Sequence, residues 1–266
     1  MAQAGIDFTP GLSDLLRSLD KNLTDVHWLR LMYAYPSCFT DEMIRTIADC
    51  SRVVKYIDMP LQHINDDLLK LMKRRVTRKE IETLLEKLRA WIPGIAIRTT
   101  FIAGSPGETD HQHAELVEFV RDFGFDMMGV FPYSAEPGTA MGKLPNQIPD
   151  DVKQARVEEL MLAQQQVAFA KAKSMIGRSI EVLIDGSTSL TAGRVGEPAS
   201  AGVSVAQTWT ARHQGQAPDI DSVVHVSGKN LHAGQLLTVS VTDYQAYDLV
   251  ARVPTKKSRS LSVLRA

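Results

Sequence analysis

The sequence predicts an α/β protein, in which part of a parallel (β/α) barrel is followed by a small antiparallel β-barrel. Through the first 135 residues, apolar runs of strand length alternate with helical patterns, and this alternation is typical of a parallel sheet. After Gly177 the helical patterns stop, and short alternating strands separated by turn residues follow. Strands of this kind without helices between them predict a small barrel or sandwich.

The first half should contain four strands, each next to a helix. Leu12, Leu15, Leu16 and Leu19 share one helical face, and Ser13 or a neighbour should cap that helix. Thr77 and Glu80 have the spacing of a capping box. Four strands are fewer than a closed eight-stranded barrel needs, so the barrel is predicted to be partial. Strands are expected at 28–34, 53–59, 95–103 and 127–133, and helices from Asp41, Asn65 and Thr77 and around Leu116.

The second half begins with a connection rich in Gly and Pro at 134–149, followed by a long helix. That helix has Asp150 and Asp151 at its start and Lys171 and Lys173 at its end, which complements the helix dipole. Strands are expected at 178–185, 223–228, 236–244 and 247–253, with a mobile Ala/Gly/Ser-rich loop at 191–205. The predicted domains are a partial barrel at 1–148, a connecting helix at 149–176, a small barrel at 177–253 and a disordered basic tail at 254–266.

Composition narrows the functional classes. The chain is 44% hydrophobic and 23% charged, with a net charge of −1, so it has no overall attraction to nucleic acid or to an anionic membrane. No apolar run approaches ~18 residues, and the first residues lack the pattern of a signal peptide. Two cysteines are too few for a disulfide framework. We therefore expect a cytoplasmic protein with no membrane partner.

The stretch "RTTFIAGSPGETD" (98–110) is the most informative one. It does not fit a phosphate loop, because Gly-Lys-Ser/Thr is missing and Glu108 places a negative charge where a phosphate would lie. A tight turn, with Thr109 or Asp110 as helix N-cap, is one interpretation. The other is a ligand loop in which Glu108 accepts hydrogen bonds from ligand hydroxyls or an amine.

Polar side chains follow three of the predicted strands. The carboxyl ends of parallel strands assemble sites in α/β sheets and barrels, so these side chains predict a pocket. An enzyme with His63 and Glu108 as acid and base is a weaker alternative, because no nucleophile or cofactor motif supports it. The three pairs are Gln62 and His63, Arg98 and Glu108, and Tyr133 and Ser134.

The residues predict no metal site. His111 and His113 are two apart on a predicted helix, so they point about 200° away from each other and cannot easily share an ion. Both are expected on a solvated helix face. Cys38 and Cys50 are twelve apart with no nearby partner, and packing is the expected role of both.

Several longer segments resemble one family. These are "LRLMYAYP", "KYIDMPLQHINDDLLKLMKRR", "RTTFIAGSPGET", "VFPYSAEPGTAM", "ARHQGQAPDIDSVVHV" and "YDLV". In this order they resemble the radical S-adenosylmethionine methylthiotransferases, in the branch that modifies an aspartate of a small-subunit ribosomal protein (the RimO type). The resemblance runs from about residue 28 to 253.

The resemblance implies a catalytic partial barrel, a small barrel called TRAM, and two [4Fe–4S] clusters. One cluster cleaves S-adenosylmethionine to a radical that abstracts a hydrogen, and the other serves sulfur transfer to the aspartate β-carbon. Gly104 and Gly107 would let the backbone approach S-adenosylmethionine, and Glu108 would accept hydrogen bonds or shape the loop. The implied cofactor-binding residues are Gln62, His63, Arg98, Thr100, Gly104, Gly107, Glu108, Phe131 and Tyr133.

The sequence departs from the family pattern at the clusters. A radical cluster needs three cysteines spaced C-x₃-C-x₂-C, and this motif is absent. The family's N-terminal domain is also missing, so we expect a carboxyl-terminal part of the enzyme that is inactive alone, with no assignable catalytic residue. The alternative is a binding module whose small barrel docks a ribosomal protein or RNA. With five Lys/Arg against seven Asp/Glu at 177–253, a basic ribosomal protein is favoured over RNA.

Overall fold

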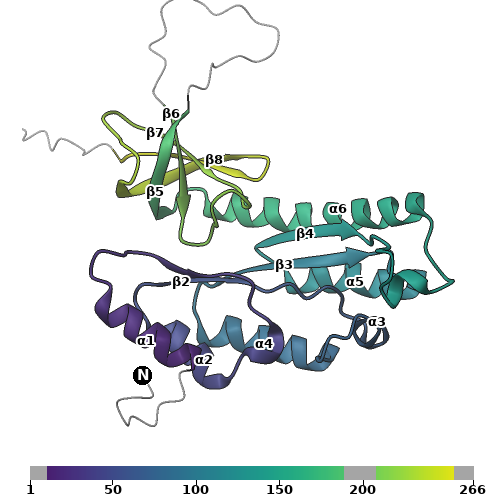
Figure 1. Ribbon diagram of the computed structural model, residues 1–266. Coiled ribbons are helices and arrows are strands. Elements are labelled where there is room, and N and C mark those ends of the chain that lie inside the picture. Colours follow the sequence, from purple (N-terminus) through teal and green to yellow (C-terminus); the bar gives the residue numbers. More distant parts are fainter. Residues whose placement is uncertain (1–10, 189–207, 255–266) are drawn as a thin grey trace, which may run out of the picture. The chain divides into compact units, whose positions relative to one another are not determined.

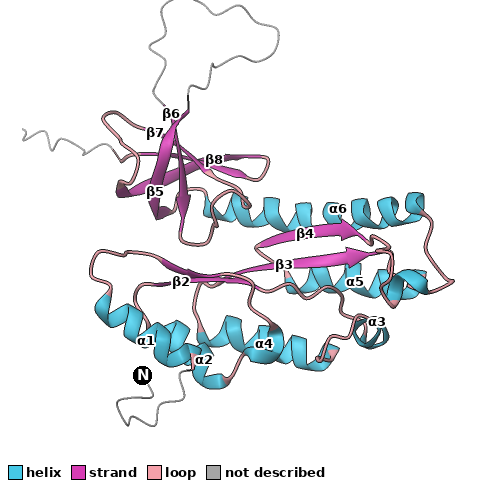
Figure 2. Cartoon of the chain, in the orientation of Figure 1, coloured by secondary structure: helices cyan, strands magenta, loops and turns pink. Residues whose placement is uncertain are grey.

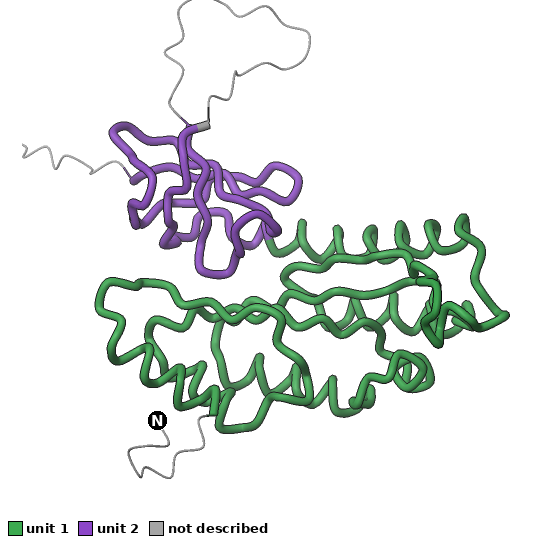
Figure 3. The backbone as a smooth tube through the Cα atoms, viewed as in Figure 1, with its two compact units in different colours: residues 1–171 green, residues 172–266 purple. Residues whose placement is uncertain are grey.

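The computed structural model describes residues 11–188 and 208–254 of the chain (Figure 1). It divides the chain into two compact units, residues 1–171 and 172–266 (Figure 3). The loop expected to be mobile at 191–205, and all of the basic tail except its first residue, lie outside the described residues. Within the described ranges, no helix is long and apolar enough to cross a membrane.

The first unit is a four-stranded parallel sheet with helices, as the sequence predicts. The strands are hydrogen-bonded in the order β1-β2-β3-β4, and each adjacent pair is parallel. They are β1 (Leu29–Leu31), β2 (Val53–Asp58), β3 (Ala96–Ala103) and β4 (Met127–Pro132). The helices are α1 (Leu12–Asn22), α2 (Asp41–Asp49), α3 (Asp66–Leu71), α4 (Arg78–Trp91), α5 (Asp110–Phe123) and α6 (Asp150–Met175), with short 3₁₀ turns at Pro36–Cys38 and Met141–Lys143.

Local sequence signals set most helix starts. Thr77 and Glu80 form the predicted capping box before α4, and Thr109 forms a second one with Gln112 before α5. At α1 the expectation was wrong, because the N-cap is Gly11. Ser13 already lies within the helix, where its backbone cannot take the extended N-cap conformation.

The core of the first unit lies between the sheet and helices α2, α4 and α5 (Figure 2). Side chains alternate along β3, so Ile97, Thr99, Phe101 and Ala103 are buried, whereas Arg98, Thr100 and Ile102 lie on the opposite face and are only partly buried. The sheet therefore has one face that packs against the helices and another that carries polar groups.

The second unit contains a closed five-stranded barrel in the order β5-β6-β7-β9-β8. Strand β6 was not among the predicted strands, and the β7–β9 pair is parallel while the other four pairs are antiparallel. Its interior is aliphatic, with Val182, Ile184, Val226, Val239 and Val241 fully or nearly fully buried. The strands are β5 (Ser179–Thr188), β6 (Thr208–His213), β7 (Val224–Ser227), β8 (Leu236–Gln245) and β9 (Asp248–Arg252).

Candidate functional site

An ion pair lies on the sheet face opposite the helix-packed face. Asp58 ends β2 and is the register neighbour of Arg98 on β3, whose Nη1 donates to Asp58 Oδ1 at 2.8 Å. The Asp58 side chain is fully buried and that of Arg98 is 17% exposed. Asp58 also accepts from the backbone N–H of Tyr33 at 3.4 Å. Asp58 therefore holds the Arg98 guanidinium on this face, and its contact with Tyr33 links the segment after β1 to the end of β2.

Two further predicted residues share this face. Thr100 is paired in register with Gly129, and Ile102 with Phe131. A Cβ atom on Gly129 would lie 3.9 Å from Thr100 Oγ1, from Arg98 Nη2 and from the Phe131 ring, so these three side chains surround the glycine. Phe131 is 59% exposed. The structure thus brings Arg98, Thr100 and Phe131 together around Gly129 of β4, which has no side chain of its own.

Gln62 lies beyond the end of β2 and is held by β3. Its N–H donates to the Thr100 carbonyl at 2.9 Å, and its own carbonyl accepts from Ile102 N–H at 2.9 Å. Its φ is +73°, which costs a residue with a side chain about 1–3 kcal/mol. Such strain persists only where neighbouring contacts over-determine it, and it is common at functional sites.

His63, the next residue, is fully buried and takes no part in the open face. Its Nδ1 accepts the N–H of Asn65 at 3.0 Å, so the neutral ring carries its proton on Nε2. That Nε2 lies 3.9 Å from Glu108 Oε2. Burial, with smaller contributions from His113 and Arg156, lowers the pKa of His63 to about 3. His63 is therefore neutral at physiological pH.

Glu108 is only 2% exposed and uses its carboxylate inside the chain. Its Oε2 accepts from the N–H groups of Gly104 at 2.9 Å and Ser105 at 3.1 Å, and its Oε1 accepts from Arg156 Nη1 at 3.0 Å. Burial raises the pKa of Glu108, opposed chiefly by Arg156. Of the interpretations of residues 98–110, this geometry supports a tight turn that Glu108 shapes, with Thr109 as the N-cap of α5.

Gly104 and Gly107 both have a φ of +77° and close neighbours within this chain. A Cβ on Gly104 would lie 2.3 Å from Lys153 Cγ, and one on Gly107 would lie 2.2 Å from Asn146 Nδ2. The N–H of Gly107 also donates to the Asn146 carbonyl at 2.9 Å. The resemblance gives these glycines a ligand as neighbour, whereas in the structure Gly104 lies against Lys153 at the start of α6 and Gly107 against Asn146 just before it.

Tyr133 and Ser134 follow β4. The N–H of Tyr133 donates to the Ala103 carbonyl at 2.8 Å, and its ring lies 5.8 Å from Lys153 Nζ. Ser134 is exposed and donates to Glu136 at 3.1 Å. Gln62 and Tyr133 therefore both hydrogen-bond to the last residues of β3, just before the 104–108 loop, while His63 and Glu108 are buried.

Sequence reasoning missed Arg156 and misplaced His113. Arg156, on α6, is buried and also donates to Asp110 at 2.7 Å. His113 is 6% exposed, and its Nε2 lies 2.9 Å from Glu159 Oε2, so the expected solvated position was wrong for it. It faces α6, a helix 46 residues away in sequence, and only a partner at such distance could have revealed its burial. His111 is exposed as expected.

The cysteines differ from one another. Cys50 is buried in the core, whereas Cys38 is exposed, so the expected packing role was wrong for Cys38. It ends the 3₁₀ turn Pro36–Cys38, in which Pro36 is the buried residue and Cys38 faces solvent. Among the residues that the structure describes, no group of three or more His, Cys, Asp or Glu could hold a metal ion.

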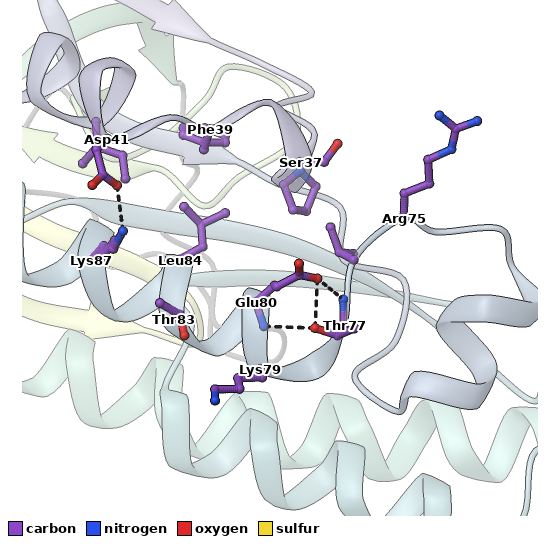
Figure 4. A pocket seen from close by; sticks show the side chains of 13 residues that line it. Ser37, Phe39, Asp41, Arg75, Thr77, Lys79, Glu80, Thr83, Leu84 and Lys87 are labelled. Atoms are coloured by element: carbon purple, nitrogen blue, oxygen red, sulfur yellow. Dashed lines mark hydrogen bonds and ion pairs between the residues drawn. The ribbon is translucent and has the colours of Figure 1, made fainter.

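Two cavities lie away from the strand ends. One, of about 430 Å³, is lined by residues of α5 and α6 that include His113, Arg156 and Glu159. The other, of about 490 Å³, lies between the start of α2 and the start of α4 (Figure 4). None of the nine predicted cofactor-binding residues lines either cavity.

The family models match both halves of the chain. The model of the Radical SAM superfamily matches residues 10–120, and the model of the TRAM domain matches residues 176–253. The chain therefore contains a region of the Radical SAM superfamily followed by a TRAM domain. Among solved structures, the chain is similar to coproporphyrinogen III oxidase (HemN) from Escherichia coli, with a TM-score of 0.49 and 18% identity over 59% of this chain and 37% of that one.

Curated relatives define the family more closely. The ribosomal protein uS12 methylthiotransferase RimO of Myxococcus xanthus is 40% identical over 253 residues, which are 94% of this chain and 50% of that protein. The RimO proteins of Bdellovibrio bacteriovorus (40% identity, 90% of this chain, 49% of that protein) and Opitutus terrae (41%, 96% and 49%) match similarly. Over at least nine-tenths of its length the chain is similar to these RimO methylthiotransferases, and it spans about half the length of each of them.

Proposed function

We propose that this chain supplies the S-adenosylmethionine-binding sheet and the TRAM barrel of a RimO-type enzyme. Such an enzyme would methylthiolate an aspartate side chain of ribosomal protein uS12 in the cytoplasm. The observation that carries the proposal is identity of about 40% to uS12 methylthiotransferases over at least nine-tenths of the chain, through both units.

The open sheet face fits a nucleoside that carries an amino acid. The exposed Phe131 ring can stack on a purine, and the Thr100 hydroxyl can hydrogen-bond a ribose oxygen. The partly exposed Arg98 guanidinium, held by the fully buried Asp58, offers a positive charge at one end of this face, which complements the carboxylate of an amino acid. Gln62 adds an amide at the strand ends.

The residues of this chain do not fit an iron–sulfur cluster. A cluster on three thiolates needs three cysteines, and the sequence has two, of which one is exposed and one lies in the core. In the family, a cluster supplies the electron that cleaves bound S-adenosylmethionine. We assign to this chain only binding, orientation of the ligand and exclusion of water.

Calorimetric titration with S-adenosylmethionine tests the binding part. We expect Thr100→Val and Phe131→Ala each to weaken binding about tenfold or more, because each removes one ligand contact worth about 1.4 kcal/mol. Tyr247→Ala is the matched control, since Tyr247 is an exposed aromatic of the barrel. Unchanged affinity in both sheet variants would refute this placement of the ligand.

A chimera tests the reaction. The half of the Myxococcus xanthus relative that this chain does not match would be joined to this chain and assayed on uS12 after anaerobic cluster reconstitution. Mass spectrometry should find one methylthio group on one aspartate of uS12. A chimera that binds S-adenosylmethionine and carries its clusters, yet leaves uS12 unmodified, would contradict the proposed substrate.

A second role concerns the barrel. With five Lys/Arg and seven Asp/Glu at 177–253, it is slightly acidic, which favours docking of a basic ribosomal protein. Pull-down of uS12 by the chain should therefore weaken as salt rises. Retention of RNA in preference to uS12 by residues 177–253 would contradict this role.

A further inference from the structure

The connection between α3 and α4 is strongly basic. Residues 70–79, "KLMKRRVTRK", contain six Lys or Arg and no Asp or Glu, in a chain whose net charge is −1. Helix α3 ends at Leu71 and α4 begins at Arg78, so most of this run lies outside regular helix. The basic run is thus a local concentration of charge that the overall composition conceals.

Two of the six cations are used within the fold. Arg74 lies over the Tyr35 ring at 4.5 Å and donates to the Pro60 carbonyl. Arg78 donates to Glu82 at 2.8 Å. These contacts hold the connection in place at both its middle and its end.

The other four cations are Lys70, Lys73, Arg75 and Lys79. All four are exposed, and no acidic side chain within the described residues forms a salt bridge with any of them. Charges of one sign this close together repel one another, and an added polyanion relieves the repulsion. The basic run therefore has structural cations and free cations side by side.

The 490 Å³ cavity adjoins this run and includes Arg75 and Lys79 in its lining. Its apolar lining includes the half-buried Phe39 and Leu84, and Figure 4 shows these between the start of α2 and the first turns of α4. Ser37 and Thr83 add hydroxyls, whereas the Thr77 hydroxyl is engaged by Glu80 in the capping box. The cavity thus combines an aromatic ring, hydroxyls and cations.

Two carboxylates also line the cavity, and both have partners. Asp41 accepts from Lys87 at 2.7 Å, and Glu80 accepts from the N–H of Thr77 at 2.7 Å in the capping box (Figure 4). Each carboxylate is therefore already engaged by a donor of this chain. Arg75 extends outward from its rim in the same view.

We propose that the basic run and its cavity bind single-stranded RNA, with phosphates on Lys70, Lys73, Arg75 and Lys79 and one base in the cavity against Phe39. Single strands are bound elsewhere by this combination of a cationic track and a stacking ring. An acidic peptide would use the cations but would leave the ring and the hydroxyls without partners. This goes beyond the proposed methylthiolation, because it requires neither S-adenosylmethionine nor a cluster, and it locates RNA contact in the α/β unit.

Fluorescence anisotropy of a labelled single-stranded RNA 12-mer, titrated with the full chain at several KCl concentrations, tests the proposal. We expect the logarithm of the association constant to fall against the logarithm of salt with a slope of about −2 to −3, for four phosphates at about −0.7 each. The charge-reversal variant Lys73→Glu/Arg75→Glu/Lys79→Glu should bind at least tenfold more weakly and with a shallower slope.

The matched control is Lys21→Glu/Arg121→Glu/Lys143→Glu, which makes the same charge change at three exposed cations outside the run. It should stay within threefold of the unmodified chain. Equal weakening in the two triple variants would overturn the proposal, because net charge would then explain binding.

Phe39→Leu tests the base in the cavity without emptying it. We expect Phe39→Leu to bind the 12-mer about fivefold more weakly. Its affinity for a 12-mer of abasic nucleotides, which keeps the phosphates and has no bases, should not change. Polyglutamate provides the remaining test. If it displaces the RNA as effectively as unlabelled RNA of equal charge, the surface recognises acidic chains in general, and the RNA proposal fails.

Discussion

The two units differ in how they complete their sheets. In the barrel, every strand is paired on both sides, from β5 with β6 and β8 to β9 with β7 and β8. In the four-stranded sheet, β1 and β4 are each paired on one side only within the described residues. The barrel therefore satisfies its own backbone, whereas the sheet keeps two edges and one face on which ligands or other chains can bind.

The units also differ in what they bury. The barrel interior is built from aliphatic side chains such as Val182, Val226 and Val239. The α/β unit buries Glu108, Arg156, His63 and His113 close to one another. Buried charges are sensitive to pH and to the loss of a partner, whereas an aliphatic core is not. A change of pH, or the loss of one buried charged partner, should therefore lower the stability of the α/β unit more than that of the barrel.

The largest effect should come from Arg156→Met. It would leave the buried Glu108 carboxylate without its cation, which costs about 3–5 kcal/mol. Urea unfolding can be followed in a Trp209→Phe background, because the remaining tryptophans, Trp28 and Trp91, belong to the first unit. Arg121→Met, at an exposed site on α5, should change stability by less than about 0.5 kcal/mol.

A matching experiment reads the barrel through Trp209 alone, with Trp28 and Trp91 replaced by Phe. There Arg156→Met should leave the unfolding midpoint unchanged. A parallel loss of stability in both units would show that they unfold together, and the contrast between them would then be wrong.

A smaller effect is expected from Gly104→Ala. The added Cβ would meet Lys153 at 2.3 Å in a backbone with φ of +77°, and the strain and overpacking together should cost about 2–4 kcal/mol. Gly94→Ala is the matched control, because Gly94 has φ of +75° and nothing within 4 Å. It should lose only about 1 kcal/mol. Equal losses would mean that the approach of Lys153 to Gly104 is unimportant.

The smallest of the three effects is the loss of folding stability of the α/β unit as the pH falls. Burial lowers the pKa of His63 to about 3, so its contribution to stability is complete above the ordinary value near 6.5 and is lost as pH falls toward 3. Between pH 7 and pH 5 the loss should be about 2 kcal/mol. The raised pKa of Glu108 acts in the opposite sense, since its contribution is lost as pH rises through that pKa.

The variant His63→Asn isolates the pH-dependent contribution of His63 to stability. The asparagine side-chain oxygen can still accept a hydrogen bond from the N–H of Asn65, but it does not titrate. The stability advantage of the unmodified chain over this variant should shrink between pH 7 and pH 5. A constant difference would show that His63 titrates normally. The barrel, read through Trp209, should show no corresponding change.

Local signals were readable from the sequence, and distant partners were not. Thr77 and Glu80 are three residues apart, so their capping box could be predicted. Arg156 and Glu108 are 48 residues apart, and nothing local marks the arginine as the partner of that carboxylate. Burial of His113 likewise depends on α6.

Strand lengths show the same division. The apolar run at 28–34 predicts seven strand residues, but β1 spans only Leu29–Leu31. Tyr33 has a φ of +56°, which interrupts the extended backbone, although the N–H of Ala34 still donates to the Asp58 carbonyl of β2. Strand β6, "TWTARH", has a single large apolar residue, Trp209, so its alternation of apolar and polar residues is too weak to predict a strand.

Hydrogen exchange of the whole chain, with and without S-adenosylmethionine and read by mass spectrometry, tests the central claim most directly. The claim is that the open sheet holds the ligand and that the barrel is complete by itself. Added ligand should slow exchange at residues 98–104 and 129–133 and leave Leu236–Gln245, already well protected, unchanged. Protection that rises in the barrel strands and not at these strand ends would contradict the claim.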